Sequence, residues 1–239
     1  MSGHSKWATI KRAKAVTDAK KGAIFTKLGN IITVAAREKG GDIENNPSLR
    51  MAVEKARSVN MPKDNIERAI KKGTGELKGD IIEELYYEAV LPNNIQFIIK
   101  CLTDNKNRSA SMVRHIVNKF GGSFGSVMWN FQQKGVIVIN QAEIKEKKID
   151  LENLQLQLID QQIEDLEILE DIIVINTSVE LLQETKHFLE GLSISIESAE
   201  IEHLAKEKQS NEDSEKISKF IEELDNIEDV SDYYSNLIN

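Results

Sequence analysis

The sequence predicts an α+β protein of three domains, an N-terminal helical domain followed by two α+β domains, the last of which is inserted into the middle one. Three observations lead to this prediction. Apolar residues recur at helical spacing through about residue 78, and beyond that point they alternate as in β-strands. A helix and a strand at the C-terminus have no partner nearby in the sequence. At 239 residues and 40% hydrophobic, the chain can bury more than one core.

The first domain is expected to contain three helices. The first helix carries apolar residues at helical spacing from Ile24 to Ala35 and stops at Gly40-Gly41. The second starts near Pro47 with Asn46 as its N-cap. The third spans MPKDNIERAIKKG, with acids early and lysines late, which suits the helix dipole at both ends. The stretch GTGELKG then reads as a linker, because it lacks the spacing and the Lys-Ser/Thr end of a phosphate-binding loop.

The middle domain is predicted to start as a β-hairpin. IIEELYYEAVL and IQFIIKCLT are separated by Pro92-Asn93-Asn94, and Cys101 belongs to the alternating apolar face of the second strand. A helix with Val113, Ile116 and Val117 follows, and then a strand near VMWNFQ that places Trp129 in the core. Cys101 is interpreted as a small buried hydrophobic residue.

A new unit is expected from Gly135, because the order of its predicted elements is βαββαβ. This is the ferredoxin-like arrangement, in which two helices cover one face of an antiparallel sheet. The unpaired C-terminal helix and strand are expected to return to the middle sheet. The predicted domains are therefore 1–78, then 79–133 together with 206–239, and the acidic insertion 134–205.

Charge is segregated along the chain. Residues 1–80 contain 17 basic and 9 acidic side chains (+8), and the remaining 159 residues contain 14 and 30 (−16), which together give the net charge of −8. A basic N-terminal region in an otherwise acidic chain is expected of a protein that binds a polyanion with one part and repels it with the rest. A merely solvated helix face is the alternative interpretation.

No catalytic or metal-binding pattern emerges from the sequence. The four histidines are scattered, there is one cysteine, and no Gly-x-Ser-x-Gly or HExxH motif occurs. Acids such as Glu164, Asp165, Glu167, Glu170 and Asp171 could pair for acid-base chemistry, but a solvated sheet edge explains them more simply. We therefore expect no enzyme, cofactor, metal or small-molecule substrate, and a hydrolase is kept only as a third hypothesis.

Nucleic acid is the predicted partner. Lys and Arg gain affinity by neutralising phosphates and releasing counterions, with a salt slope of roughly 0.7 to 0.9 per phosphate contacted. Trp7 either stacks on an unpaired base or anchors the basic arm to the helical domain. Lys106 and Arg108, in TDNKNRS, are a second candidate phosphate contact, although capping explains most of that motif. The predicted nucleic-acid-binding residues are Lys6, Trp7, Lys11, Arg12, Lys14, Lys20, Lys21, Lys27, Lys71, Lys72, Lys106 and Arg108.

The predicted location is the cytoplasm, and no membrane partner is expected. No apolar run is long enough to span a bilayer, and the basic opening lacks the apolar core of a secretory signal. A mitochondrial transit peptide is the rival interpretation of that opening. Against it, the basic pattern continues as Arg37, Arg50 and Arg57 into segments predicted to be folded helices.

Three blocks of sequence resemble the YebC/PmpR family. They are GHSKWATIKRAKAVTDAKKGAIFTKL, NPSLRMAVEKARSVNMPKDNIERAIKKGTGE and LTDNKNRSASMVRHIVNKFGG. The resemblance implies three domains around an acidic cavity, nucleic-acid binding and control of gene expression without known catalysis. The resemblance implies two different functions: bacterial members carry the label of probable transcriptional regulators, whereas the mitochondrial branch and more recent views of bacterial members point to the ribosome and relief of stalled translation.

The chain departs from the family pattern in places. Ala13 and Ala23 stand where the family usually has a further basic residue, and GGSFGSVMW runs straight on where a longer loop is common. The sequence is compatible with two functions. One is a regulator of transcription that binds DNA through the helical domain, and the other is a ribosome-associated factor whose arm contacts rRNA and relieves stalled translation.

Overall fold

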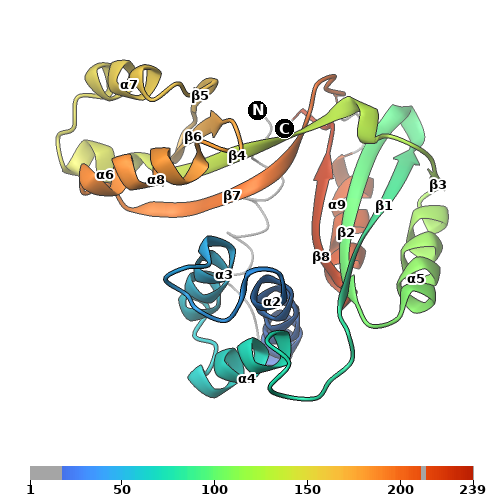
Figure 1. The fold of residues 1–239 in the computed structure, drawn as a ribbon. Coiled ribbons are helices and arrows are strands. Elements are labelled where there is room, and N and C mark those ends of the chain that lie inside the picture. Colours follow the sequence, from blue (N-terminus) through green and yellow to red (C-terminus); the bar gives the residue numbers. More distant parts are fainter. Residues whose placement is uncertain (1–17, 211–213, 239) are drawn as a thin grey trace. The chain divides into compact units, whose positions relative to one another are not determined.

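The computed structural model describes residues 18–210 and 214–238, which fall into two compact units. One unit is Asn130–Lys206. The other contains the described residues up to Trp129 together with the C-terminal segment from Glu207. Figure 1 shows both units coloured along the sequence.

The helical domain consists of α2 (Asp18–Lys39), α3 (Pro47–Ser58) and α4 (Lys63–Gly73) (Figure 1). Its core joins residues of all three helices, including Ile32, Leu49 and Ile66. Asn46 is the N-cap of α3, as predicted: its side-chain oxygen accepts from the backbone N–H of Leu49 at 3.0 Å. Its amide also donates to the carbonyls of Ala35 and Gly40, so this buried residue joins α3 to the end of α2.

The middle domain is an antiparallel sheet with two helices packed on one face. Its strands lie in the order β3-β1-β2-β8. Their bounds are β1 (Glu83–Leu91), β2 (Ile95–Thr103), β3 (Ser123–Phe124) and β8 (Val230–Ser235). The 3₁₀ turn η1 (Pro92–Asn94) closes the hairpin of β1 and β2. The covering helices are α5 (Lys106–Lys119) and α9 (Ser214–Asp225). The predicted return of the C-terminal elements is confirmed, because β8 pairs with β2.

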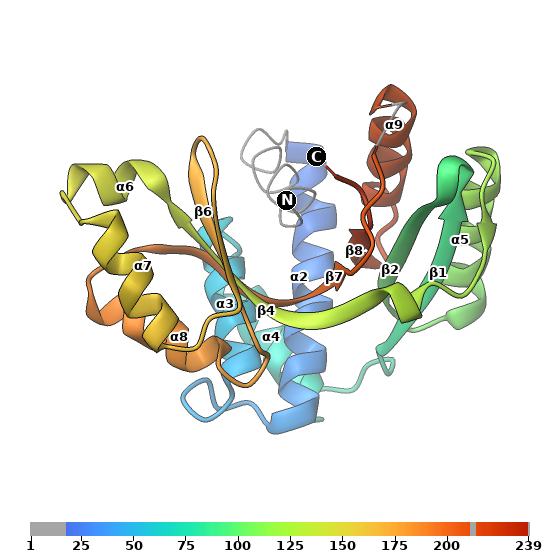
Figure 2. The same cartoon turned by 90° about the horizontal axis from the view of Figure 1, so that it is seen from above.

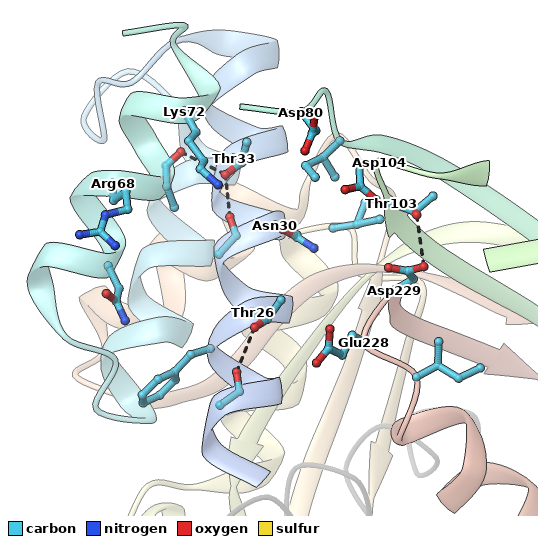
Figure 3. Close-up of a pocket in the computed structure, with 18 of the residues that line it drawn as sticks. Thr26, Asn30, Thr33, Arg68, Lys72, Asp80, Thr103, Asp104, Glu228 and Asp229 are labelled. Carbon is cyan, nitrogen blue, oxygen red and sulfur yellow. Dashed lines mark hydrogen bonds between the residues drawn. The ribbon is translucent and has the colours of Figure 1, made fainter. Parts of the chain in front are cut away.

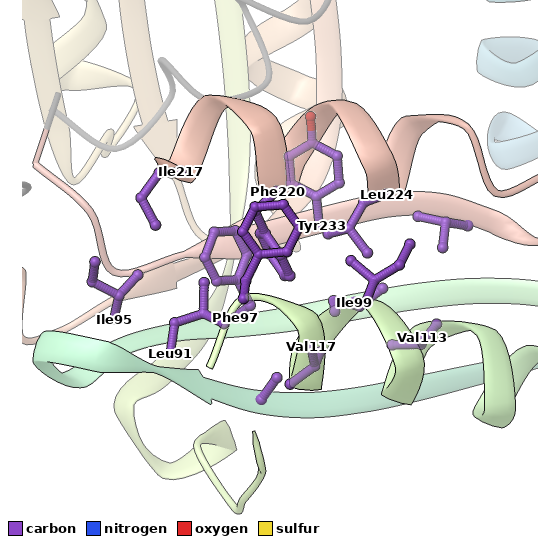
Figure 4. Packing of buried hydrophobic residues seen from close by; sticks show 14 of the residues in the cluster. Leu91, Ile95, Phe97, Ile99, Val113, Val117, Ile217, Phe220, Leu224 and Tyr233 are labelled. Carbon is purple, nitrogen blue, oxygen red and sulfur yellow. The ribbon is translucent and has the colours of Figure 1, made fainter. Parts of the chain in front are cut away.

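The core of this domain joins segments from both ends of its sequence. Phe97 of β2 meets Phe220 of α9 (Figure 4) with ring centroids 4.9 Å apart in an edge-on geometry. The ring of Phe120, directly after α5, lies 5.5 Å from that of Phe220. Cys101 is completely buried in this cluster, as predicted. Aromatic side chains from β2, α5 and α9 therefore fix the C-terminal segment on the sheet.

The strand predicted near VMWNFQ is wrong. Met128–Asn130 form the 3₁₀ turn η2, and β4 begins only at Phe131, so the strand of the middle sheet that comes directly after α5 is the short β3. Trp129 is 59% exposed and not a core residue; its indole N–H donates to the carbonyl of Ser126 at 3.1 Å. The buried positions of this stretch are instead Val127, Asn130 and Phe131.

The unit Asn130–Lys206 has the predicted ferredoxin-like order, with its sheet arranged β5-β6-β4-β7. Figure 2 shows α6, α7 and α8 on one side of this sheet. The bounds are β4 (Phe131–Asn140), α6 (Gln141–Glu146), α7 (Leu151–Asp160), β5 (Asp165–Ile168), β6 (Ile172–Thr177), α8 (Leu182–Gly191) and β7 (Ile196–Ala205). Helix α6 was not predicted; Asn140 caps it by accepting from the backbone N–H of Ala142 at 2.8 Å.

Within the part of the chain that the structure describes, no helix combines the length and the apolar character needed to cross a membrane.

Candidate functional site

The predicted nucleic-acid-binding residues fall into three groups in the structure. Lys6, Trp7, Lys11, Arg12 and Lys14 lie outside the described residues. Lys20 and Lys21 lie in the first turn of α2. The remaining five residues, Lys27, Lys71, Lys72, Lys106 and Arg108, are on described helices of one unit.

Helix α4 presents a basic face to solvent because its other face is committed to the core. Ile66 and Ala69 are buried against α2 and α3, which leaves Arg68, Lys71 and Lys72 exposed. Gly73 sets the close approach of α4 to α2, because a Cβ there would lie 2.4 Å from the carbonyl oxygen of Thr33. The last turn of α4 is therefore held rigidly while its lysines face outward.

A polar groove of about 830 Å³ runs between the helical domain and the middle domain, both within the same unit. Figure 3 shows Arg68 and Lys72 of α4 on one wall and Asp104, Glu228 and Asp229 on the other. Asn30 extends from α2 between them (Figure 3). Cationic and anionic side chains thus both line the groove, together with hydrogen-bonding groups such as Asn30 and Thr103.

Arg108 occupies the end of the groove at the start of α5. Its Nε donates to Oδ2 of Asp229 at 3.1 Å, its Nη2 donates to Oδ1 of the same carboxylate at 2.8 Å, and Nη2 is also 2.8 Å from Oδ1 of Asp104. These hydrogen bonds raise the pKa of the Arg108 guanidinium. A phosphate that binds Arg108, as predicted, therefore competes with the hydrogen bonds that the guanidinium already makes to Asp229 and Asp104.

Asp229 is the buried partner of this ion pair. Burial opposes its ionisation, but hydrogen bonds from Arg108, Ser109 and Thr103 outweigh that effect and lower the pKa of Asp229 below its usual value. The Ser109 hydroxyl donates at 2.7 Å. Asp229 thus stays charged and joins the β2–α5 junction to the start of β8.

Lys106 lies on the exposed side of the same junction. Its ammonium pairs with Oε2 of Glu83 at 2.7 Å, and both side chains are about half exposed. Asn105 caps α5, as predicted, by accepting from the backbone N–H of Arg108 at 3.0 Å. Exposed pairs of this kind contribute little to stability, so Lys106 is readily available to an anion.

Lys27 is less accessible than its sequence position suggests. Its ammonium donates to the carbonyl of Asp225 at the end of α9, at 2.8 Å. Burial lowers the pKa of Lys27, although the nearby acids Asp225 and Asp232 oppose that effect. Its proposed contact with nucleic acid remains a prediction.

The described residues offer little for metal or thiol chemistry. No group of three or more His, Cys, Asp or Glu side chains in the described ranges is arranged to hold a metal ion. Burial raises the pKa of the Cys101 thiol to about 12, which keeps it protonated at neutral pH.

Sequence reasoning missed several residues of the groove. Arg68 belonged to the predicted third helix, but its charge was not singled out, and Asn30 and Asn65 carried no recognisable motif. Asp229 could not have been found as the partner of Arg108, because 121 positions separate them. The periodicity of α4 could have identified Arg68, since it lies one turn before Lys71 and Lys72 on the exposed face.

The fold and the groove define a class of three-domain α+β proteins with a basic helical domain at the N-terminus. The sequence model described as "TACO1/YebC protein N-terminal domain" matches residues 5–76, and the model described as "TACO1/YebC second and third domain" matches residues 82–237. The chain therefore belongs to the YebC/PmpR family.

Relatives and a solved structure agree with this membership. A "Probable transcriptional regulatory protein" of Thermotoga petrophila is 50% identical over 241 residues, covering 99% of this chain and 93% of the relative. A protein of the same name from Thermotoga maritima is 49% identical with the same coverage. The crystal structure of a conserved hypothetical protein from Aquifex aeolicus has a TM-score of 0.80 at 38% identity and covers 94% of this chain and 93% of that chain.

Proposed function

We propose that the protein is a non-enzymatic regulator of gene expression that binds nucleic acid through its basic N-terminal region. The observation that supports this most directly is the exposed face of α4, where Arg68, Lys71 and Lys72 stand together on a helix fixed by its buried face. The seven basic residues against one acid in the first 27 positions extend the same charge. Such side chains neutralise phosphates whatever the base sequence.

The similarity to probable transcriptional regulatory proteins favours transcription as the regulated process, and hence DNA as the target. The alternative is rRNA and translation, supported by the chemistry of the exposed face of α4. That face offers Lys and Arg side chains that suit phosphates, whereas reading bases in a major groove usually relies on several side chains aligned to reach base edges. Asn65 also carries a hydrogen-bonding amide side chain on α4, but this side chain is half-buried and lines the groove.

The salt dependence of binding tests the role of α4. We compare Lys71→Gln/Lys72→Gln with wild type, using fluorescence anisotropy on single-stranded RNA and duplex DNA over a range of salt concentrations. Removing two phosphate contacts should weaken binding and lower the slope of log affinity against log salt by about 1.4 to 1.8. The matched control is Lys145→Gln/Lys148→Gln, which removes two exposed lysines from the acidic unit and should leave the slope unchanged.

A second experiment distinguishes the two targets. Cell lysate is fractionated on a sucrose gradient at low and high salt, and nucleic acid is crosslinked to the protein and sequenced. Promoter DNA without rRNA would contradict the ribosomal alternative, whereas rRNA without promoter DNA would contradict the transcriptional one. An unchanged salt slope in the Lys71→Gln/Lys72→Gln variant would contradict the role given to α4.

A further inference from the structure

The unit Asn130–Lys206 carries an apolar hollow on its surface that nucleic-acid binding does not use. The hollow has a volume of about 490 Å³ and lies between α7 and β5, which are neighbours in Figure 1. We call it the α7–β5 hollow. It is lined by Glu152, Gln155, Leu156, Ile159, Ile163, Glu164, Asp165 and Leu166.

Helix α7 is apolar on two sides. Leu154 and Leu158 are buried in the core of the unit, as expected for a helix that covers a sheet. Leu156 and Ile159 point the other way and are 63% and 62% exposed. Two large aliphatic side chains one turn apart on a solvent face indicate a surface that is covered by a partner, because single scattered apolar residues would not form a lined hollow.

The rim of the hollow is acidic. Its ionisable lining residues are Glu152, Glu164 and Asp165, and no basic residue lines it. Lys134 forms an ion pair with Glu164, whereas Glu152 and Asp165 form no ion pair among the residues that the structure describes. An apolar floor with anionic edges is complementary to a segment in which Lys or Arg residues flank aliphatic ones.

The secondary structure of the occupant follows from the edge strand beside the hollow. Among the described strands, β5 pairs only with β6 and so lies at the edge of the sheet, where another strand can in principle be added. It is only four residues long, however, and carries Asp165 and Glu167, which are features that protect a sheet edge against such pairing. A helix that lays its apolar face along Leu156 and Ile159 makes the better fit.

We propose that the α7–β5 hollow is a docking site for a basic amphipathic helix of a partner protein. Aliphatic side chains of that helix pack on Leu156 and Ile159, while its Lys or Arg residues lie beside Glu152 and Asp165. This site is separate in the sequence from the basic helical domain, and it does not depend on the proposed nucleic-acid binding.

The test uses a designed probe and the full-length protein. The probe is a short fluorescein-labelled helical peptide with leucines at i, i+3, i+4 and i+7 and lysines on both sides of that stripe. Leu156→Ser/Ile159→Ser should weaken its binding about tenfold or more, because the peptide loses two apolar contacts. Glu152→Gln/Asp165→Asn should weaken it mainly at low salt.

Matched controls separate docking from general attraction to an acidic protein. Leu192→Ser/Ile201→Ser removes two other exposed aliphatic residues of the unit, and Glu146→Gln/Glu184→Gln removes two other exposed acids. Neither control should change the affinity. A peptide with Glu in place of Lys should not bind, and circular dichroism checks that every variant remains folded.

A crosslinking experiment gives a second readout that does not rely on the Ser variants. Benzoylphenylalanine in place of Leu156 should crosslink to the peptide on illumination, and the same group in place of Leu192 should not. Equal binding by hollow and control variants, or equal crosslinking from both positions, would overturn the proposal. It would also be overturned if sedimentation of the protein alone showed a dimer that Leu156→Ser/Ile159→Ser abolishes, since a second copy would then be the occupant.

Discussion

Arg108 and Asp229 form a two-point ion pair that joins the start of α5 to the start of β8 across 121 positions of sequence. The two hydrogen bonds measure 3.1 and 2.8 Å. Asp229 is buried, whereas the Arg108 side chain is 46% exposed. The pair therefore fixes the C-terminal segment on the middle domain at one wall of the groove.

Replacement of Arg108 by Ala should destabilise the protein by about 2 kcal/mol, since Asp229 would lose its charged partner and stay buried. The loss falls short of that for a fully buried pair because water reaches the exposed side of Arg108. Urea unfolding of Arg108→Ala, Asp229→Ala and the double variant gives the coupling energy between the two residues. Additive effects would contradict the ion pair. Lys219→Ala, which breaks an exposed pair with Glu215 on α9, is the control and should change stability little.

The same carboxylate predicts a decline of stability in acid. The folded-state pKa of Asp229 is lowered relative to an unfolded value of about 3.9. Between the two pKa values the unfolded chain binds more protons than the folded one, so stability rises with pH in that range. The contribution is fully present above the unfolded pKa and is lost as pH falls through the folded pKa. Asp229→Asn should be less stable than wild type at neutral pH. As the pH is lowered from 5, the variant should lose less stability than wild type, and urea unfolding at each pH measures this. Parallel curves would contradict this assignment.

Asn46 should be the most sensitive polar residue of the helical domain. Asn46→Ala removes the cap of α3 and the donor shared by the carbonyls of Ala35 and Gly40, which should cost about 2 kcal/mol. Asn45→Ala is the matched control, because Asn45 is exposed and its amide donates to the exposed Asp42 carboxylate at 2.6 Å. Thermal unfolding that shifts equally in both variants would exclude the proposed role of Asn46.

Much of the fold could be predicted because its signals are local. Asn46 before Pro47, the glycine pair after α2 and the alternation through β2 each mark an element by itself. Gly135 misled the interpretation, because it reads as a break between two strands. In the structure it lies within the single strand β4, where a Cβ would come within 2.5 Å of Oγ1 of Thr177 and 2.8 Å of Cβ of Leu182. Glycine is needed there for close packing and not for a turn.

The groove was harder to predict because its walls come from distant segments. The lysines of α4 were identifiable from charge and periodicity, but the acids opposite them come from the β2–α5 junction and the α9–β8 loop. Only the tertiary fold brings Asp229 to Arg108 and the carbonyl of Asp225 to Lys27. The sequence does not distinguish a basic side chain that is exposed to solvent from one that is half-buried. Lys72 is exposed, whereas Lys27 is half-buried against the end of α9.

Trp129 is held in its exposed position by Glu88. The carboxylate Oε2 of Glu88 accepts from the backbone N–H groups of Val127 and Met128, at 2.5 and 2.6 Å, and its carbonyl accepts from Gly125 at 3.1 Å. Glu88→Ala should therefore loosen η2 and cost about 1 kcal/mol.

Two measurements check this role of Glu88. Amide hydrogen exchange at Val127 and Met128 should accelerate in Glu88→Ala, because both N–H groups lose their acceptor. In a Trp7→Phe background, where Trp129 is the remaining tryptophan, its fluorescence anisotropy should fall as the turn becomes more mobile. Glu83→Ala is the control, since this acid on the same strand pairs with Lys106 and not with the turn. Glu83→Ala should exchange at Val127 and Met128 as wild type does. If Glu88→Ala also exchanged at the wild-type rate, the Glu88 carboxylate would not be the group that orders η2.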